Sequence, residues 1–121
     1  MKEVVVVKPV EYPEVKSVED ISASFPDKTV RIGGYLDDMV ILAVEQTEGV
    51  PLNRAVYETD GSQIRQIIAG DFVICGIEKD GSLRGLRQEE IRICLERFRQ
   101  PEKFITAGNV VFAVPYHRIW R

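Results

Sequence analysis

The sequence is poor in the residues that build most catalytic and metal-binding sites. Its 121 residues include one histidine, His117, and two cysteines, Cys75 and Cys94. A chain with one histidine cannot form a metal site that needs two histidines from the same chain. The short glycine motifs GGY (33–35) and AGD (69–71) lack the spacing of a nucleotide-binding loop. The sequence therefore favours a non-catalytic protein that holds no metal and no cofactor.

Long hydrophobic runs are also missing. The longest purely apolar runs are Val4 to Val7 and Met39 to Val44, far below the roughly 20 residues that a membrane-spanning helix needs. The first run is too short for the core of a signal peptide, which has about 7–15 apolar residues, and acidic residues flank it. We expect a cytoplasmic protein with no membrane partner.

The two cysteines lie 19 positions apart, each within an apolar pattern. A disulfide framework needs more cysteines and an oxidising compartment, and a zinc site needs clustered ligands that this sequence does not offer. Free cysteine is among the residues most often buried. We therefore predict two buried, reduced thiols.

Charge is ordinary in amount but uneven in placement. Charged residues make up 29% of the chain, and the formal net charge is −3. Residues 1–83 sum to −7, whereas residues 84–121 sum to +4 and are rich in arginine. Such a basic segment is typical of a face that meets an acidic partner. It also fits a solvated helix whose charges pair along it, and both interpretations stay open.

Hydrophobic patterns predict strands and helices that alternate along the chain. Expected strands span residues 3–8, 29–36, 39–45, 54–57, 72–77 and 110–114. A short helix is predicted from Ser17, because Ser17 and Asp20 match a capping pattern and Pro26 would end the helix. A single helical turn is predicted at 63–68, with Gly70 ending it in a left-handed conformation.

The clearest helix lies in the basic segment and has one apolar stripe that must face a sheet. The stripe consists of Ile91, Cys94, Leu95 and Phe98. Together these elements predict an α+β fold, in which two helices pack on one face of a mixed or antiparallel sheet of about five strands. Residues 1–104 would form the domain, and residues 105–121 a C-terminal extension that adds a final strand to it.

Strand 72–77 is expected in the core of the domain. Phe72, Ile74 and Gly76 alternate with Val73, Cys75 and Ile77, and both sets are apolar or small. A strand covered on both faces needs this pattern. We interpret the segment as core.

Asn53, Arg54 and Asp71 are the candidate ligand-binding residues. An arginine after Pro51 and Asn53 could hold a phosphate or carboxylate through two hydrogen bonds. It could equally tie its loop to Glu58 or Asp60. Asp71 could act as a base at the start of a strand, or accept hydrogen bonds from turn amides.

A candidate interaction surface lies in the arginine- and aromatic-rich C-terminal third. Its residues are Arg92, Arg99, Tyr116, His117, Arg118, Trp120 and Arg121. Such residues anchor protein–protein contacts, and aromatics mixed with arginines also stack on bases and meet phosphates. A tail that covers the edge of the sheet, or a frayed terminus, is the structural alternative.

Several segments in combination resemble a small family found in bacteria and phages, the domain of unknown function 3846. They are PLNRA (51–55), the turn Asp60-Gly61, IIAGDFVICG (67–76) and the helix end LERF (95–98), and the resemblance covers about residues 3–104. The chain departs from the family at Arg87-Gln88-Glu89, where the family tends to have a threonine, so no N-cap is obvious. The family has no established activity, so the resemblance implies no catalytic residue. It implies a bacterial or phage setting, often on a mobile element.

Three functions remain open. The leading hypothesis is a small non-catalytic module that binds another protein or a second copy of itself. The second is nucleic-acid binding through the last helix and the tail, which the acidic overall charge disfavours. The third is a small enzyme or ligand-binding domain with a site at Arg54, Asp71 and the Gly33-Gly34 segment.

Overall fold

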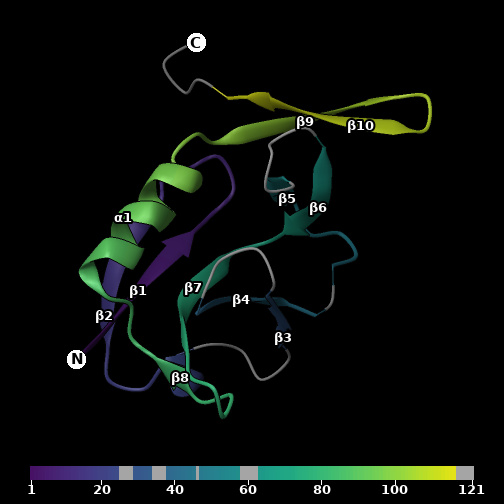
Figure 1. The fold of residues 1–121 in the computed structure, drawn as a ribbon. Coiled ribbons are helices and arrows are strands. Elements are labelled where there is room, and N and C mark those ends of the chain that lie inside the picture. The colour runs from purple at the N-terminus through teal and green to yellow at the C-terminus, as the bar shows by residue number, and fades with distance from the viewer. Residues whose placement is uncertain (25–28, 34–37, 46, 58–62, 117–121) are drawn as a thin grey trace.

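The computed structural model describes residues 1–24, 29–33, 38–45, 47–57 and 63–116 (Figure 1). The described part is mostly β, with 52% of its residues in strands and 12% helical. The described part has one α-helix, α1 (Gln88–Arg97), and a short 3₁₀ turn at Ser22–Ser24. The strands are β1 (Lys2–Val7), β2 (Glu14–Val18), β3 (Thr29–Ile32), β4 (Met39–Val44), β5 (Leu52–Tyr57), β6 (Ile64–Ala69), β7 (Phe72–Ile77), β8 (Leu83–Arg84), β9 (Glu102–Ala107) and β10 (Val110–Pro115).

The main sheet is antiparallel throughout and has the strand order β2-β1-β7-β4-β3, with β8 also paired to β7. Strand β7 lies between β1 and β4, so that Val73 is opposite Val6 on one side and Leu42 on the other. All but the last of its residues are buried. The prediction that this segment belongs to the core is confirmed.

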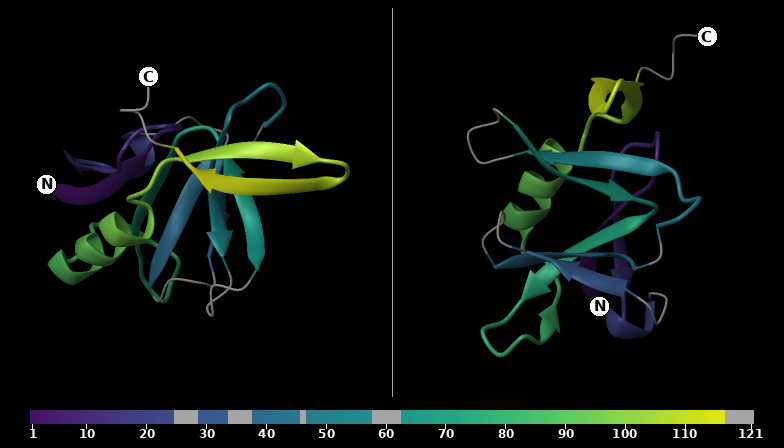
Figure 2. Two further views of the ribbon diagram at one scale, coloured as in Figure 1. Left: turned by 90° about the horizontal axis from the view of Figure 1, so that it is seen from above. Right: turned by 90° about the vertical axis from the view of Figure 1, so that its right-hand side faces the viewer.

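One face of the main sheet is covered by α1 and by the two-stranded sheet β5–β6 (Figure 2). The predicted stripe of α1 packs here, with Cys94 and Phe98 buried and Ile91 and Leu95 partly buried. The ring of Phe98 meets that of Phe72 edge-on, with centroids 5.3 Å apart. On the opposite face, Ile21 packs on a smaller cluster that includes Cys75.

The helix predicted from Ser17 is wrong. Residues Glu14–Val18 form strand β2, which pairs with β1 over five positions. The carboxylate of Asp20 accepts hydrogen bonds from the amides of Ser22 and Ala23 in a tight turn. Asp20 therefore does not cap a helix that starts at Ser17. Pairing of β-branched residues with a ready partner strand overrides a capping pattern of only a few residues.

The helical turn predicted at 63–68 is also wrong, because Ile64–Ala69 is strand β6 and pairs with β5. Short runs of isoleucine fit a buried helix or a strand equally well in sequence, and the neighbouring strand decides. Gly70 is left-handed as predicted, with φ of +74°, but it ends a strand. A Cβ at Gly70 would lie 2.9 Å from Cγ1 of Val50, so the turn requires glycine.

The predicted α+β class is therefore a misassignment. The fold is mostly β with one α-helix in the described residues and several sheets, rather than two helices on one sheet. The final strand forms as β10, but it pairs with β9, a strand that the patterns did not predict, and not with the main sheet. Within the described residues no helix is long and apolar enough to cross a membrane.

Candidate functional site

Asn53 and Arg54 lie in β5 and are almost completely buried, with Arg54 only 1% exposed. The side-chain amide of Asn53 donates hydrogen bonds to the carbonyls of Val7, at 3.0 Å, and Gly70, at 2.7 Å. The end of β1 and the turn before β7 are thereby joined through one side chain. A buried amide that finds two carbonyl acceptors stabilises the segments that carry them.

The guanidinium of Arg54 continues this network. Its Nε donates to the carbonyl of Phe98 at 3.2 Å, at the C-terminal end of α1, where a cation is favourable. Its Nη1 donates to Oδ1 of Asn53 at 2.9 Å, and Nη2 donates to the carbonyl of Glu11. Burial lowers the pKa of Arg54, and the charge of Glu102 acts in the opposite direction.

These contacts give Asn53 and Arg54 an architectural role, since their donors meet carbonyls of three separate segments. The ligand role predicted for them stays a prediction. The ties to Glu58 and Asp60 that the sequence also suggested involve residues outside the described part of the chain.

Asp71 is exposed and lies on the opposite side of the main sheet from α1, at the mouth of a groove of about 700 Å³. Lys8 lies at the same mouth. Gly33, the other member of the predicted enzyme site, lines a separate hollow of about 250 Å³ with Asp38 and Met39. The described residues thus place Asp71 and Gly33 in different hollows, and Gly34 lies outside the described residues.

The candidate interaction surface divides into two parts. Arg92 is exposed on α1 and pairs with Glu89 and Glu96, which raise its pKa. Arg99 and Arg92 line a shallow hollow beside Tyr12. The exposed side of α1 therefore carries paired charge, as the alternative interpretation of the basic segment required.

Tyr116 lies elsewhere, at the base of a two-stranded hairpin. Its amide donates to the carbonyl of Pro101 at 2.8 Å, and its carbonyl accepts a hydrogen bond from the side chain of Gln100. The remaining predicted residues, His117, Arg118, Trp120 and Arg121, lie outside the described residues.

The hairpin formed by β9 and β10, residues 102–115, is here called the arm. In Figure 1 it extends above β5 and β6, with its turn pointing away from α1. Glu102 anchors its base, because its carboxylate accepts hydrogen bonds from the amide of Ala55 and the hydroxyl of Tyr57. The turn contains Gly108 in a left-handed conformation.

Three large apolar side chains on the arm are exposed: Ile105 (45%), Val110 (52%) and Phe112 (50%). Ile105 lies directly opposite Phe112, and strand alternation puts Val110 on the same side as Phe112. The three residues are called the arm face. The strand-forming run Phe104-Ile105-Thr106 before an AGN turn (107–109) was the signal that could have revealed it.

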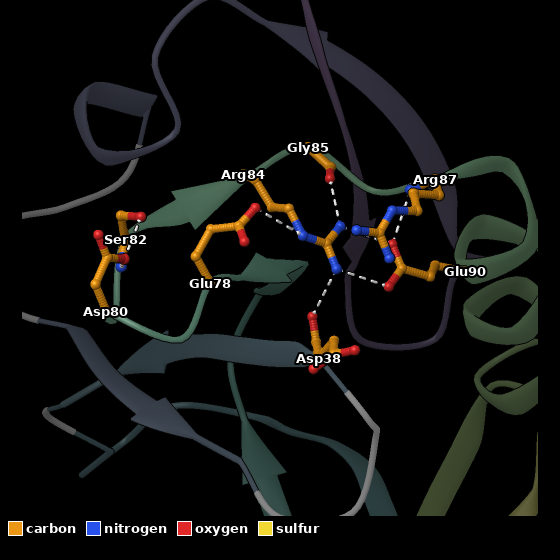
Figure 3. A network of polar contacts seen from close by, with 8 residues as sticks. All are labelled: Asp38, Glu78, Asp80, Ser82, Arg84, Gly85, Arg87 and Glu90. Atoms are coloured by element: carbon orange, nitrogen blue, oxygen red, sulfur yellow. Dashed lines mark hydrogen bonds and ion pairs between the residues drawn. The ribbon is translucent and has the colours of Figure 1, made fainter.

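A second polar network, around Arg84, joins β8 to the start of α1 (Figure 3). The guanidinium donates two hydrogen bonds to the carboxylate of Glu90, at 2.8 and 2.9 Å, and one to the carbonyl of Asp38. Gly76 makes room for it, since a Cβ there would lie 2.3 Å from Nη1. The hydrogen bonds from Arg84 lower the pKa of Glu90.

Glu90 also caps the start of α1, where this chain lacks the threonine that the family tends to have. The amide of Arg87, at the N-cap position, donates to Oε1 of Glu90 at 2.8 Å. A carboxylate three residues into the helix therefore satisfies an amide that has no partner within the helix.

Both cysteines are free and buried, as predicted. Burial raises the pKa of Cys75 to about 11 and that of Cys94 to about 12, so neither thiol ionises near neutral pH. Cys94 Sγ lies 3.7 Å from the sulfur of Met39. Among the described residues no cluster of three or more acidic, cysteine or histidine side chains could hold a metal ion.

The arrangement defines a small, mostly β domain in which one helix and a short second sheet cover one face of the main sheet. The family described as "Domain of unknown function (DUF3846)" matches residues 1–99, so the chain belongs to that family. The match confirms the resemblance drawn from the sequence, and it ends before the arm begins. No curated protein and no solved structure matches the chain.

Proposed function

We propose that this protein is a non-catalytic module that binds another protein through the arm face. The observation that carries the proposal is the exposure of Ile105, Val110 and Phe112 on one side of a projecting hairpin. Water-exposed apolar clusters on a soluble domain are typical of partner-binding surfaces. A two-stranded hairpin is only marginally stable by itself, so a partner that covers this face would also stabilise the arm.

The edge of the arm gives the partner a second way to bind. Among the described strands, β10 pairs with β9 alone, so its outer edge presents backbone groups that have no strand partner. An extended segment of another protein could add to this edge while its side chains contact the arm face. A partner with an apolar, extended segment fits both features.

We also propose that the protein is cytoplasmic and comes from a bacterial or phage setting. A bacterial host lysate is therefore the source of partners. The immobilised full chain would be used in a pull-down with and without nuclease. We expect a protein that is retained after nuclease treatment and is lost with Phe112→Ser.

The matched control is Tyr12→Ser, which removes an exposed aromatic residue, 62% exposed, beside Arg92 and Arg99. It should leave the partner bound. Loss of the partner with Tyr12→Ser and retention with Phe112→Ser would move the contact to α1 and overturn the arm proposal. Recovery that disappears with nuclease would instead support the nucleic-acid alternative.

The nucleic-acid alternative has less support from the described residues. Arg92 is neutralised by two glutamates, and so offers less to a phosphate than its sequence position suggested. Binding through phosphates would weaken steeply with added salt, whereas binding through the apolar arm face would not.

A further inference from the structure

The described residues cover only part of the face of the main sheet away from α1. Its floor is a row of side chains that lie opposite one another on three strands, Val6 on β1, Val73 on β7 and Leu42 on β4. Ile21 packs over part of this face. The part that remains is the groove of about 700 Å³, bounded by Pro9 and by Val50.

Most of the groove lining is apolar, and its volume lies in the range of small-molecule sites. The centre of the opposite face is filled, because Phe98 at the end of α1 and Ile68 of β6 pack there with Phe72 of the main sheet. The groove is therefore the place on this sheet where an apolar molecule could enter without displacing the core.

The polar groups of the groove gather at its rim. Val7 is paired with Phe72, so the next position along the two strands places Lys8 beside Asp71, on the same face as Val6 and Val73. Among the described residues, the side chains of Lys8 and Asp71 take part in no ion pair or hydrogen bond. Charged groups left unpaired at the mouth of an apolar groove are available to a ligand.

A second cation lies farther along the rim. Lys16 is paired with Val4 on the same face, and its ion pair with Glu14, at 3.8 Å, is exposed to solvent. The charged groups that line the groove are thus Lys8, Lys16 and Asp71, with a net charge of +1. The rim is complementary to an anion.

We propose that this groove binds a small amphipathic carboxylate, with its hydrocarbon part over Val6, Leu42 and Val73 and its carboxylate at Lys8. Asp71 sets the selectivity for the charge of the head group, because it repels the carboxylate that Lys8 attracts. The site uses neither the arm nor Asn53 and Arg54, so the inference goes beyond the proposed function and does not depend on it.

Three probes with the same tail test the proposal: octanoate, octanol and octylammonium, each titrated into the full chain while methyl signals are followed by NMR. We expect saturable shifts at Val6, Leu42 and Val73, with octanoate bound more tightly than octylammonium. Lys8→Gln should weaken octanoate about tenfold, the effect of losing one hydrogen bond to a charged group, and leave octanol unchanged. Asp71→Asn should strengthen octanoate and weaken octylammonium.

Lys79→Gln is the matched control, because Lys79 is exposed and lines the separate hollow beside Gly33. It should leave all three affinities unchanged. The proposal would be overturned if no saturable shifts were seen, or if the shifts were confined to the arm face. It would also be overturned if the three probes bound with the same affinity whatever their head group. Both charge variants change exposed side chains, so they should fold like the parent. Unchanged octanoate binding in Phe112→Ser would keep this site distinct from the protein-binding surface.

Discussion

The body of the molecule, up to Pro101, and the arm that follows it can be compared by the side chains that each buries and exposes. In the body, even Arg54 and Asn53 are buried, and their donors are satisfied by main-chain carbonyls. In the arm, Ile105 and Phe112 remain exposed. The body therefore satisfies its buried polar groups within the chain, whereas the arm leaves large apolar side chains exposed.

A large effect on stability is expected in the body, at Arg54. Arg54→Ala would leave the buried carbonyl of Phe98 and the part-buried carbonyl of Glu11 without donors, and should lower the free energy of unfolding by about 3 kcal/mol. Urea unfolding followed by circular dichroism measures this. The control is Arg92→Ala, which removes an exposed arginine and should leave the midpoint nearly unchanged. Equal effects of the two changes would contradict the buried network.

A smaller effect is expected at Glu90, whose carboxylate meets both Arg84 and the amide of Arg87. Glu90→Gln should cost about 1–2 kcal/mol at neutral pH. The folded state lowers the pKa of Glu90 below its ordinary value of 4.5. The unfolded chain therefore binds this proton first, and the stabilisation is complete above that value and is lost as the pH falls from it through the lower pKa of the folded state.

Unfolding midpoints of the parent and Glu90→Gln should accordingly converge as the pH is lowered from 7 towards about 3. The contrast is Glu89→Gln on the same helix, where Arg92 also lowers the pKa of a fully exposed carboxyl. High salt should remove the effect at Glu89 and preserve most of that at Glu90. A pH-independent gap between the parent and Glu90→Gln would contradict the assignment.

How far the sequence predicted this structure depends on whether the deciding contacts are local. Strand β7 and helix α1 were predictable because each carries its own period over several residues. Strand β2 was not, because the decision between helix and strand at Ser17 came from pairing with Glu3, across the sheet. The predicted fold class was wrong because short segments such as this one were assigned to helices.

The candidate sites show the same limit. Arg54 was singled out as a ligand candidate, but its acceptors on Phe98 and Glu11 are 44 and 43 positions away in sequence. Asp71 was noticed, whereas its neighbour Lys8 was not, because only the register of β1 against β7 brings them together. Strand register is a property of the assembled sheet and cannot be obtained from one strand.

The smallest effect on stability is expected in the arm, and one residue type makes the comparison direct. Phe98→Ser removes a ring that is 2% exposed and packs on Phe72, and should cost about 3–5 kcal/mol. Phe112→Ser removes a ring that is 50% exposed, and should cost less than about 1 kcal/mol. Urea midpoints of both variants, measured without a partner, test this. A cost at Phe112 close to that at Phe98 would mean that the arm belongs to the core, and the arm face would then no longer be a surface kept free for a partner.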